Sequence, residues 1–258
     1  MIATIALAAL QAPSPAIFLS ISETGRQWRV YYEPVVRMAY APDAVVLPSD
    51  SKLGRRGEIL LFFVDATTNE LYSIRSTNTG AKWSDRERVN VEGAGGPPSV
   101  AIAEDGTLRL FLANGNGIVA FKSADSRTFE SLGLVLDAPG THDPEVIRFD
   151  GEWLLFVSIG GEVRMAQSKD GASFTMDEQF RMRGTAPGAY VSADKRLRLF
   201  FPGAGIWSRV RRDDGTFANE AGYHLTPVEG TQIGNPSPLI MPSGLHLIFC
   251  DVSWAPRN

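Results

Sequence analysis

Short apolar runs separated by polar or glycine-rich turns dominate the chain. The five strongest runs are rich in β-forming residues and are Ile59–Val64, Leu108–Leu112, Trp153–Val157, Leu197–Phe201 and Leu245–Phe249. Apolar runs of this length, bounded by turn residues, predict buried β-strands. No stretch beyond the N-terminal run has a sustained helical period, so the pattern predicts an all-β fold.

A polar turn that ends in an aromatic residue recurs along the chain. Its copies are SETGRQW at Ser22–Trp28, STNTGAKW at Ser76–Trp83, SADSRTF at Ser123–Phe129, SKDGASF at Ser168–Phe174, and a degraded copy that ends at Phe217. The closing aromatic residues are 43 to 55 residues apart. The longest interval is explained by an insertion around Ser49–Gly57. A period near 45 residues with strand-like content predicts four-stranded propeller blades.

The number of repeats predicts a closed ring. Four units are contiguous, at about 41–92, 93–138, 139–182 and 183–230. The C-terminal piece Asn235–Asp251 supplies only two strands, and the N-terminal piece Ala16–Val36 supplies two more. We therefore predict a five-bladed β-propeller in which N-terminal strands complete the C-terminal blade, which leaves no free sheet edge. This propeller would form a single domain over 16–258, preceded by an apolar segment at 1–15.

The N-terminal segment bears on localisation. The apolar run Ile2–Leu10 is too short to cross a bilayer, and no other stretch could span one. Its length resembles the end of a secretory signal peptide, although no Lys or Arg precedes Arg26. The alternative is a segment packed on the domain surface. We expect a secreted or periplasmic protein, with a cytoplasmic location left open.

Composition and charge exclude several functions. The 258 residues carry a net charge of −4 with scattered basic residues, which argues against nucleic acid as the main partner. The single cysteine, Cys250, cannot form an internal disulfide or a cysteine-based metal cluster. The three histidines lie in separate units without metal-ligand spacing. We therefore predict no metal and no cofactor, and we expect a monomer.

Three of the predicted blade starts carry a family resemblance. They read Ala41-Pro42-Asp43-Ala44, His142-Asp143-Pro144-Glu145 and Gly234-Asn235-Pro236-Ser237-Pro238. Together with the stretch from Asp143 to Phe156, they resemble five-bladed glycoside hydrolases of the arabinanase, xylosidase and invertase type (families 43, 62, 32 and 68). The polar turns loosely resemble the Asp-box of sialidase-type propellers. A true sialidase fits less well, because no arginine cluster for a substrate carboxylate is visible.

The resemblance implies a site at the mouth of the central funnel that binds a carbohydrate or another small molecule. Asp43 matches the family's base or nucleophile, and Asp143 matches its orienting aspartate. Glycosidic cleavage also needs a general acid. The fourth blade start, Arg183–Gly188, has no carboxylate. Glu145 shares a strand face with Asp143 and is the candidate for a displaced acid.

Three further residues are candidate ligand contacts, namely His142, Tyr190 and Asn235. The structural alternative is that Asp43 and Asp143 cap turns through local backbone amides. Three hypotheses follow for the whole chain. It is a glycosidase that acts through funnel carboxylates, a propeller that binds a glycan or another ligand without cleaving it, or an interaction scaffold.

Overall fold

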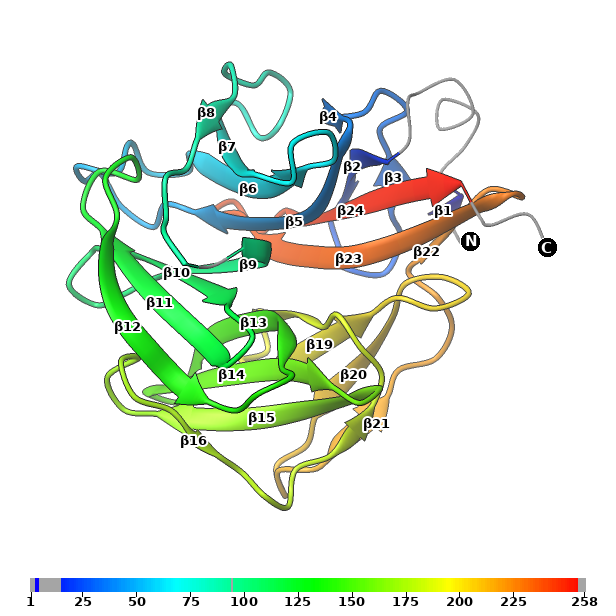
Figure 1. The fold of residues 1–258 in the computed structure, drawn as a ribbon. Coiled ribbons are helices and arrows are strands. Elements are labelled where there is room, and N and C mark those ends of the chain that lie inside the picture. Colours follow the sequence, from blue (N-terminus) through cyan, green and yellow to red (C-terminus); the bar gives the residue numbers. More distant parts are fainter. Residues whose placement is uncertain (1–2, 5–14, 94, 255–258) are drawn as a thin grey trace.

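The chain forms small antiparallel sheets that follow one another around a ring (Figure 1). The computed structural model describes residues 3–4, 15–93 and 95–254. Within these residues there is no helix, and therefore none long and apolar enough to cross a membrane. Most of the apolar run Ile2–Leu10, on which the signal-peptide interpretation depends, lies outside the described residues.

Four blades are built from consecutive strands, each paired antiparallel with the next. The first blade contains β5 (Ala39–Val46), β6 (Ile59–Asp65), β7 (Leu71–Ser76) and β8 (Glu87–Arg88). The second contains β9 (Gly95–Ile102), β10 (Leu108–Ala113), β11 (Gly117–Ser123) and β12 (Glu130–Asp137). The third contains β13 (His142–Phe149), β14 (Glu152–Ile159), β15 (Glu162–Ser168) and β16 (Thr175–Met176), with β17 (Met182–Arg183) also on β15. The fourth contains β18 (Gly188–Val191), β19 (Leu197–Phe201), β20 (Trp207–Arg211) and β21 (Phe217–Asn219).

The fifth blade joins the two ends of the chain. It contains β23 (Thr231–Ile240), β24 (His246–Trp254), β2 (Ala16–Ser22) and β3 (Arg29–Val30), with β4 (Val36–Arg37) also on β2. The β2–β24 ladder runs without a break from Ala16 opposite Val252 to Ser22 opposite His246. This pairing confirms the predicted five-bladed ring and its closure by N-terminal strands. A short strand β1 (Ala3–Thr4) pairs in parallel with β22 (Leu225–Thr226) outside the blades.

The recurring polar turns have a structural role. In the third blade, the Ser168 hydroxyl accepts a hydrogen bond from the Gly171 N–H at 3.0 Å and donates one to Asp170 at 2.9 Å. The closing aromatic then packs between blades, as Phe174 does against Phe111 at 5.8 Å between ring centroids. These contacts support the structural interpretation of the turns, because their polar groups are consumed locally.

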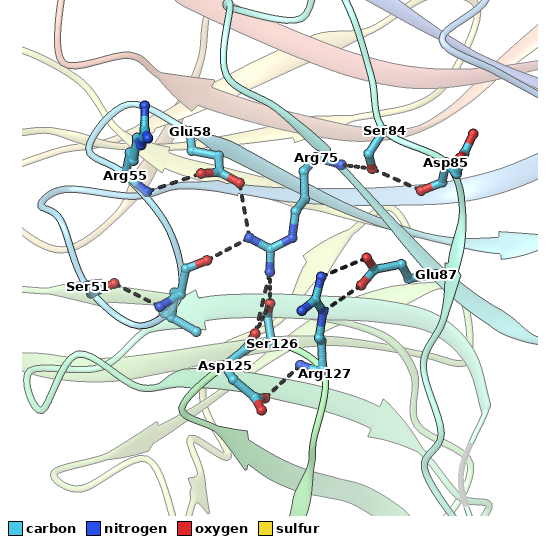
Figure 2. A network of polar contacts seen from close by, with 11 residues as sticks. Ser51, Arg55, Glu58, Arg75, Ser84, Asp85, Glu87, Asp125, Ser126 and Arg127 are labelled. Carbon is cyan, nitrogen blue, oxygen red and sulfur yellow. Dashed lines mark hydrogen bonds and ion pairs between the residues drawn. The ribbon is translucent and has the colours of Figure 1, made fainter.

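The predicted insertion is a loop between β5 and β6 that Arg75 fastens to the second blade (Figure 2). The guanidinium of Arg75 donates to the Leu53 carbonyl at 2.6 Å and to the Glu58 carboxylate at 3.0 Å. It also donates to the Ser126 hydroxyl in a turn of the second blade. One partly buried cation therefore joins the loop to two blades.

Replacing Arg75 should destabilise the protein. Arg75→Ala leaves the Glu58 carboxylate, whose side chain is only 9% exposed, without its cation. We expect the free energy of unfolding to fall by about 2–3 kcal/mol in chemical denaturation. The control is Arg127→Ala, because the Arg127–Glu87 pair has side chains 66% and 40% exposed and should contribute less than about 1 kcal/mol. Equal losses for the two variants would contradict this role of Arg75.

Candidate functional site

A proline occupies the same place near the start of the first strand in every blade. These prolines line one hollow at the centre of the ring and are Pro42, Pro98, Pro144, Pro187 and Pro236. In four blades the preceding residue has a φ between 43° and 49°, a left-handed conformation that is uncommon for residues other than glycine. These four residues are Ala41, Asp143, Ala186 and Asn235. The sequence analysis found four of the five starts and missed Pro97-Pro98.

The residue after each proline lies at the joint with the next blade. In four blades its side chain accepts a hydrogen bond from a backbone N–H of the neighbouring first strand. The pairs, acceptor first, are Asp43 and Val100 at 2.6 Å, Ser99 and Val146 at 2.8 Å, Glu145 and Ala189 at 2.6 Å, and Ser237 and Ala44 at 3.0 Å. We call these four bonds the inter-blade ring. Two of its four acceptors are carboxylates, namely Asp43, which matches the base or nucleophile in the family resemblance, and Glu145, the candidate for a displaced acid.

The fifth junction, between the fourth and fifth blades, lacks such a bond for a specific reason. Here the residue after the proline is Gly188, which has no side chain that could accept a hydrogen bond. The residue at the place of the backbone donor is Pro238, which has no N–H. The two backbones approach closely instead. A Cβ atom on Gly188 would lie 1.8 Å from the Pro236 carbonyl oxygen and 2.8 Å from the Pro238 side chain. Only glycine fits this contact.

Gly188→Ala should therefore disrupt closure of the ring. The added methyl group meets backbone rather than a flexible side chain, so the two blades must separate. We expect a loss of about 3 kcal/mol in the free energy of unfolding. Gly95→Ala is a suitable control, because a Cβ on Gly95 meets nothing within 4 Å. If denaturation midpoints of the two variants coincided, the close approach at Gly188 would not limit stability.

Burial changes the acidity of the two ring carboxyls. Asp43 and Glu145 are 6% and 7% exposed. Burial raises the pKa of Asp43 to about 6, although hydrogen bonds from Val100 and Ser237 oppose the rise. Burial and the neighbouring charge of Asp43 raise the pKa of Glu145 well above its usual range. Both groups lie within the joints between blades and are largely closed to solvent.

The raised pKa of Asp43 predicts a pH dependence of stability. An acid whose pKa is higher in the folded state holds its proton more tightly there, so its contribution is lost as pH rises. Between pH about 4 and about 7, wild type should lose about 3 kcal/mol relative to Asp43→Asn. Chemical denaturation across this range measures the difference. Asp214→Asn is the control with a flat profile over this range, because bonds from Thr216 lower the pKa of Asp214 and its contribution to stability is lost only below pH about 4. Parallel pH profiles for wild type and Asp43→Asn would contradict the prediction.

Two further carboxylates lie near the hollow, namely Asp143, which lines it, and the buried Asp251. Asp143 precedes its proline, its side chain is 21% exposed, and its Oδ2 lies 2.9 Å from Nδ1 of the half-exposed His142. Asp251, which the sequence analysis missed, accepts bonds at 2.7 Å from the Asn235 side chain and from the Ala41 N–H. Burial raises the pKa of Asp251, and the charge of Asp143 raises it further. The sequence signal that could have identified Asp251 is its position directly after a buried strand run.

The hollow between the prolines is very small. Its volume is about 20 Å³, which is room for about one water molecule. It is lined by Asp43, Asp143, Glu145 and Asn235, so the structure brings these predicted site residues together. Tyr190 lies elsewhere, in a cleft between the fourth and fifth blades. Among the described residues no group of three or more His, Cys, Asp or Glu side chains could hold a metal ion.

Comparison with known proteins relates the fold to glycosidases. No protein-family model matches the chain, and no curated protein matches it in sequence. Solved structures do match. A putative glycoside hydrolase from Parabacteroides distasonis has a TM-score of 0.62 at 13% identity, over 88% of this chain and 90% of that one. An endo-arabinase from Bacteroides thetaiotaomicron has a TM-score of 0.59 at 13% identity, over 87% and 96%.

A longer enzyme matches in part. For the xylan β-1,4-xylosidase from Bacillus halodurans the TM-score is 0.58 at 16% identity, over 83% of this chain but only 56% of that one. The chain therefore has the five-bladed propeller fold of family 43 glycosidases. At these identities the similarity establishes the fold, and activity must be argued from the site.

Proposed function

We propose that this chain is a glycoside hydrolase-like propeller that binds a carbohydrate at its mouth without cleaving it. The observation that carries the proposal is the use of Asp43 and Glu145 as acceptors for backbone amides of neighbouring blades. Glycosidic cleavage needs one carboxyl that protonates the leaving oxygen and a second that attacks or activates water. Carboxyls buried in the inter-blade ring can reach neither position.

The mouth itself supports binding without turnover. Its fourth blade contributes Ala186 and Pro187 where a general acid would be needed, and the hollow has room for about one water. A sugar ring would therefore lie across the mouth. There it meets His142, Asp143 and Asn235, whose donors and acceptors suit hydroxyl groups. The endo-arabinase and the xylosidase that share this fold support a carbohydrate as the ligand class.

A specific observation favours hydrolysis as the second candidate function. Asp143 is partly exposed, and its charge helps to raise the pKa of the buried Asp251. A carboxyl whose pKa is raised by burial can act as a general acid beside a second carboxyl. In this alternative Asp251 would be the proton donor and the more exposed Asp143 its partner.

An aryl-glycoside screen combined with calorimetric titration of arabino- and xylo-oligosaccharides tests the proposal. We expect no turnover of arabinofuranosides, xylosides, fructosides or sialosides. We expect binding of an oligosaccharide that weakens about tenfold in Asp143→Asn, the loss expected for one charge-assisted contact. Asp150→Asn is the matched control, because Asp150 is an exposed turn aspartate with a φ of 51°, close to the 47° of Asp143.

The outcomes separate the two candidates. Turnover that is lost in both Asp143→Asn and Asp251→Asn would favour hydrolysis through this pair. Turnover lost in Asp43→Asn, in protein that remains folded, would mean that the buried ring carboxyl acts chemically. Absence of both turnover and carbohydrate binding would remove the proposed function.

A further inference from the structure

A polar cleft beside the fourth blade lies apart from the mouth. It has a volume of about 660 Å³, within the range of small-molecule sites. It lies between the fourth and fifth blades, at the ends of the first strands opposite to the prolines. Ser192 and Asp194 reach it from the turn after β18, and Gly25 reaches it from the turn after β2. His246, at the start of β24, lies opposite Ser22 and Ile240.

A continuous hydrogen-bond chain includes two residues of one wall of the cleft, His224 and Glu220. The Trp28 indole N–H, which can only donate, donates to Nδ1 of His224 at 3.3 Å. Nε2 of the neutral ring must then carry the proton and donate to the Ser208 hydroxyl at 2.7 Å. Ser208 donates in turn to Glu220 at 2.7 Å. Every proton position in this hydrogen-bond chain is therefore determined by its neighbours.

Arg198 lies in the same wall and offsets the negative charge of its carboxylates. Its Nε donates to Glu220 at 3.3 Å, and its other nitrogens donate to Asp194 at 2.9 and 3.2 Å. The cleft also contains Arg26, so two cations balance two anions. Burial and the charge of Arg198 lower the pKa of His246, and burial is the main cause that lowers the pKa of His224. Both imidazoles are neutral at pH 7, and the lining carries no net charge.

Next to Arg198, whose cross-strand neighbour is Tyr190, the lining offers polar groups that have no protein partner. The Tyr190 hydroxyl and both ring nitrogens of His246 have no hydrogen bond within the described part of the chain, and His246 Nδ1 is buried. Tyr190 is held rigid, stacked on Phe200 at 5.3 Å and edge-on to His246 at 5.8 Å between ring centroids. Such unpaired groups in a concave site gain most from a ligand that can both donate and accept hydrogen bonds.

Gly25 leaves open space in the cleft beside His246 and Tyr190. A Cβ atom on Gly25 would lie 3.1 Å from His246 Nδ1 and 3.5 Å from the Tyr190 hydroxyl. Any larger residue would push against the imidazole and occupy space beside the hydroxyl. The same glycine has a φ of 72°, so the turn also favours glycine through its backbone.

We propose that this cleft is a second ligand site, separate from the mouth, which binds a neutral, hydroxyl-rich molecule of one or two sugar rings through Tyr190 and His246. The two cations and two anions of the lining leave it without net charge, which favours a neutral ligand over a strongly charged one. Hydroxyl groups match the unpaired donor and acceptor groups. Tyr223, at 42% exposure, offers an aromatic face at the rim for the C–H face of a sugar ring.

Titration calorimetry with the full chain tests this site. The probes are methyl glucoside, arabinobiose and xylobiose as neutral sugars, and glucuronate and glucosamine as charged ones. We expect at least one neutral probe to bind and the charged probes to bind at least tenfold more weakly. Tyr190→Phe removes only the hydroxyl and should weaken binding about tenfold. Tyr72→Phe, in the first blade, is its control and should leave the affinity within twofold.

Two glycine substitutions distinguish the effect of filling the cleft from the effect of backbone strain. Gly25→Ala should abolish binding, whereas Gly106→Ala should leave it unchanged, because Gly106 has a similar φ of 76° and open space around it. Asp143→Asn distinguishes this site from the mouth, because it should leave cleft binding intact. Affinity that is insensitive to Tyr190→Phe and Gly25→Ala, tighter binding of a charged probe, or no binding of any neutral sugar would each overturn the proposal.

Discussion

The ladder between β2 and β24 is the interaction on which the structure depends. It joins strands from the two ends of the chain and turns a row of four blades into a closed ring of five. Without it, the first and fourth blades would each expose a face, and the first-strand positions could not meet at one centre. Closure also completes the inter-blade ring, because the bond from Ala44 to Ser237 crosses the junction of the first and fifth blades.

The inter-blade ring gives two of the predicted site carboxylates a structural role. A funnel lined by polar first-strand residues is the part of a propeller where carboxylates could act on a sugar. In this chain Asp43 and Glu145 instead bind backbone amides across two blade junctions. Their desolvation is tolerated because each accepts bonds from buried N–H groups that would otherwise lack partners. In this chain these carboxylates therefore stabilise the packing between blades.

The two candidate sites differ in how they are built. The mouth is formed by backbone geometry, since prolines and left-handed residues bring five strand starts together around a hollow of about 20 Å³. The cleft between the fourth and fifth blades is formed by side chains, among them the ion-paired Arg198 and Glu220 and the neighbouring Tyr190. A fixed charge pattern and unpaired polar groups make the cleft selective, whereas the mouth offers a shallow polar surface.

The strands, the blade count and the closure could be predicted from the sequence, because they depend on local apolar runs and on the number of strands per repeat. The environment of each carboxyl depends instead on contacts between blades. Asp43 follows its proline, whereas Asp143 precedes its own and has the left-handed conformation at the point where the strand ladder is interrupted, so Asp43 is buried and Asp143 is partly exposed. The charge of Asp143 raises the pKa of Asp251 although the two residues lie far apart in the sequence, and interactions between distant parts of a chain leave no local pattern.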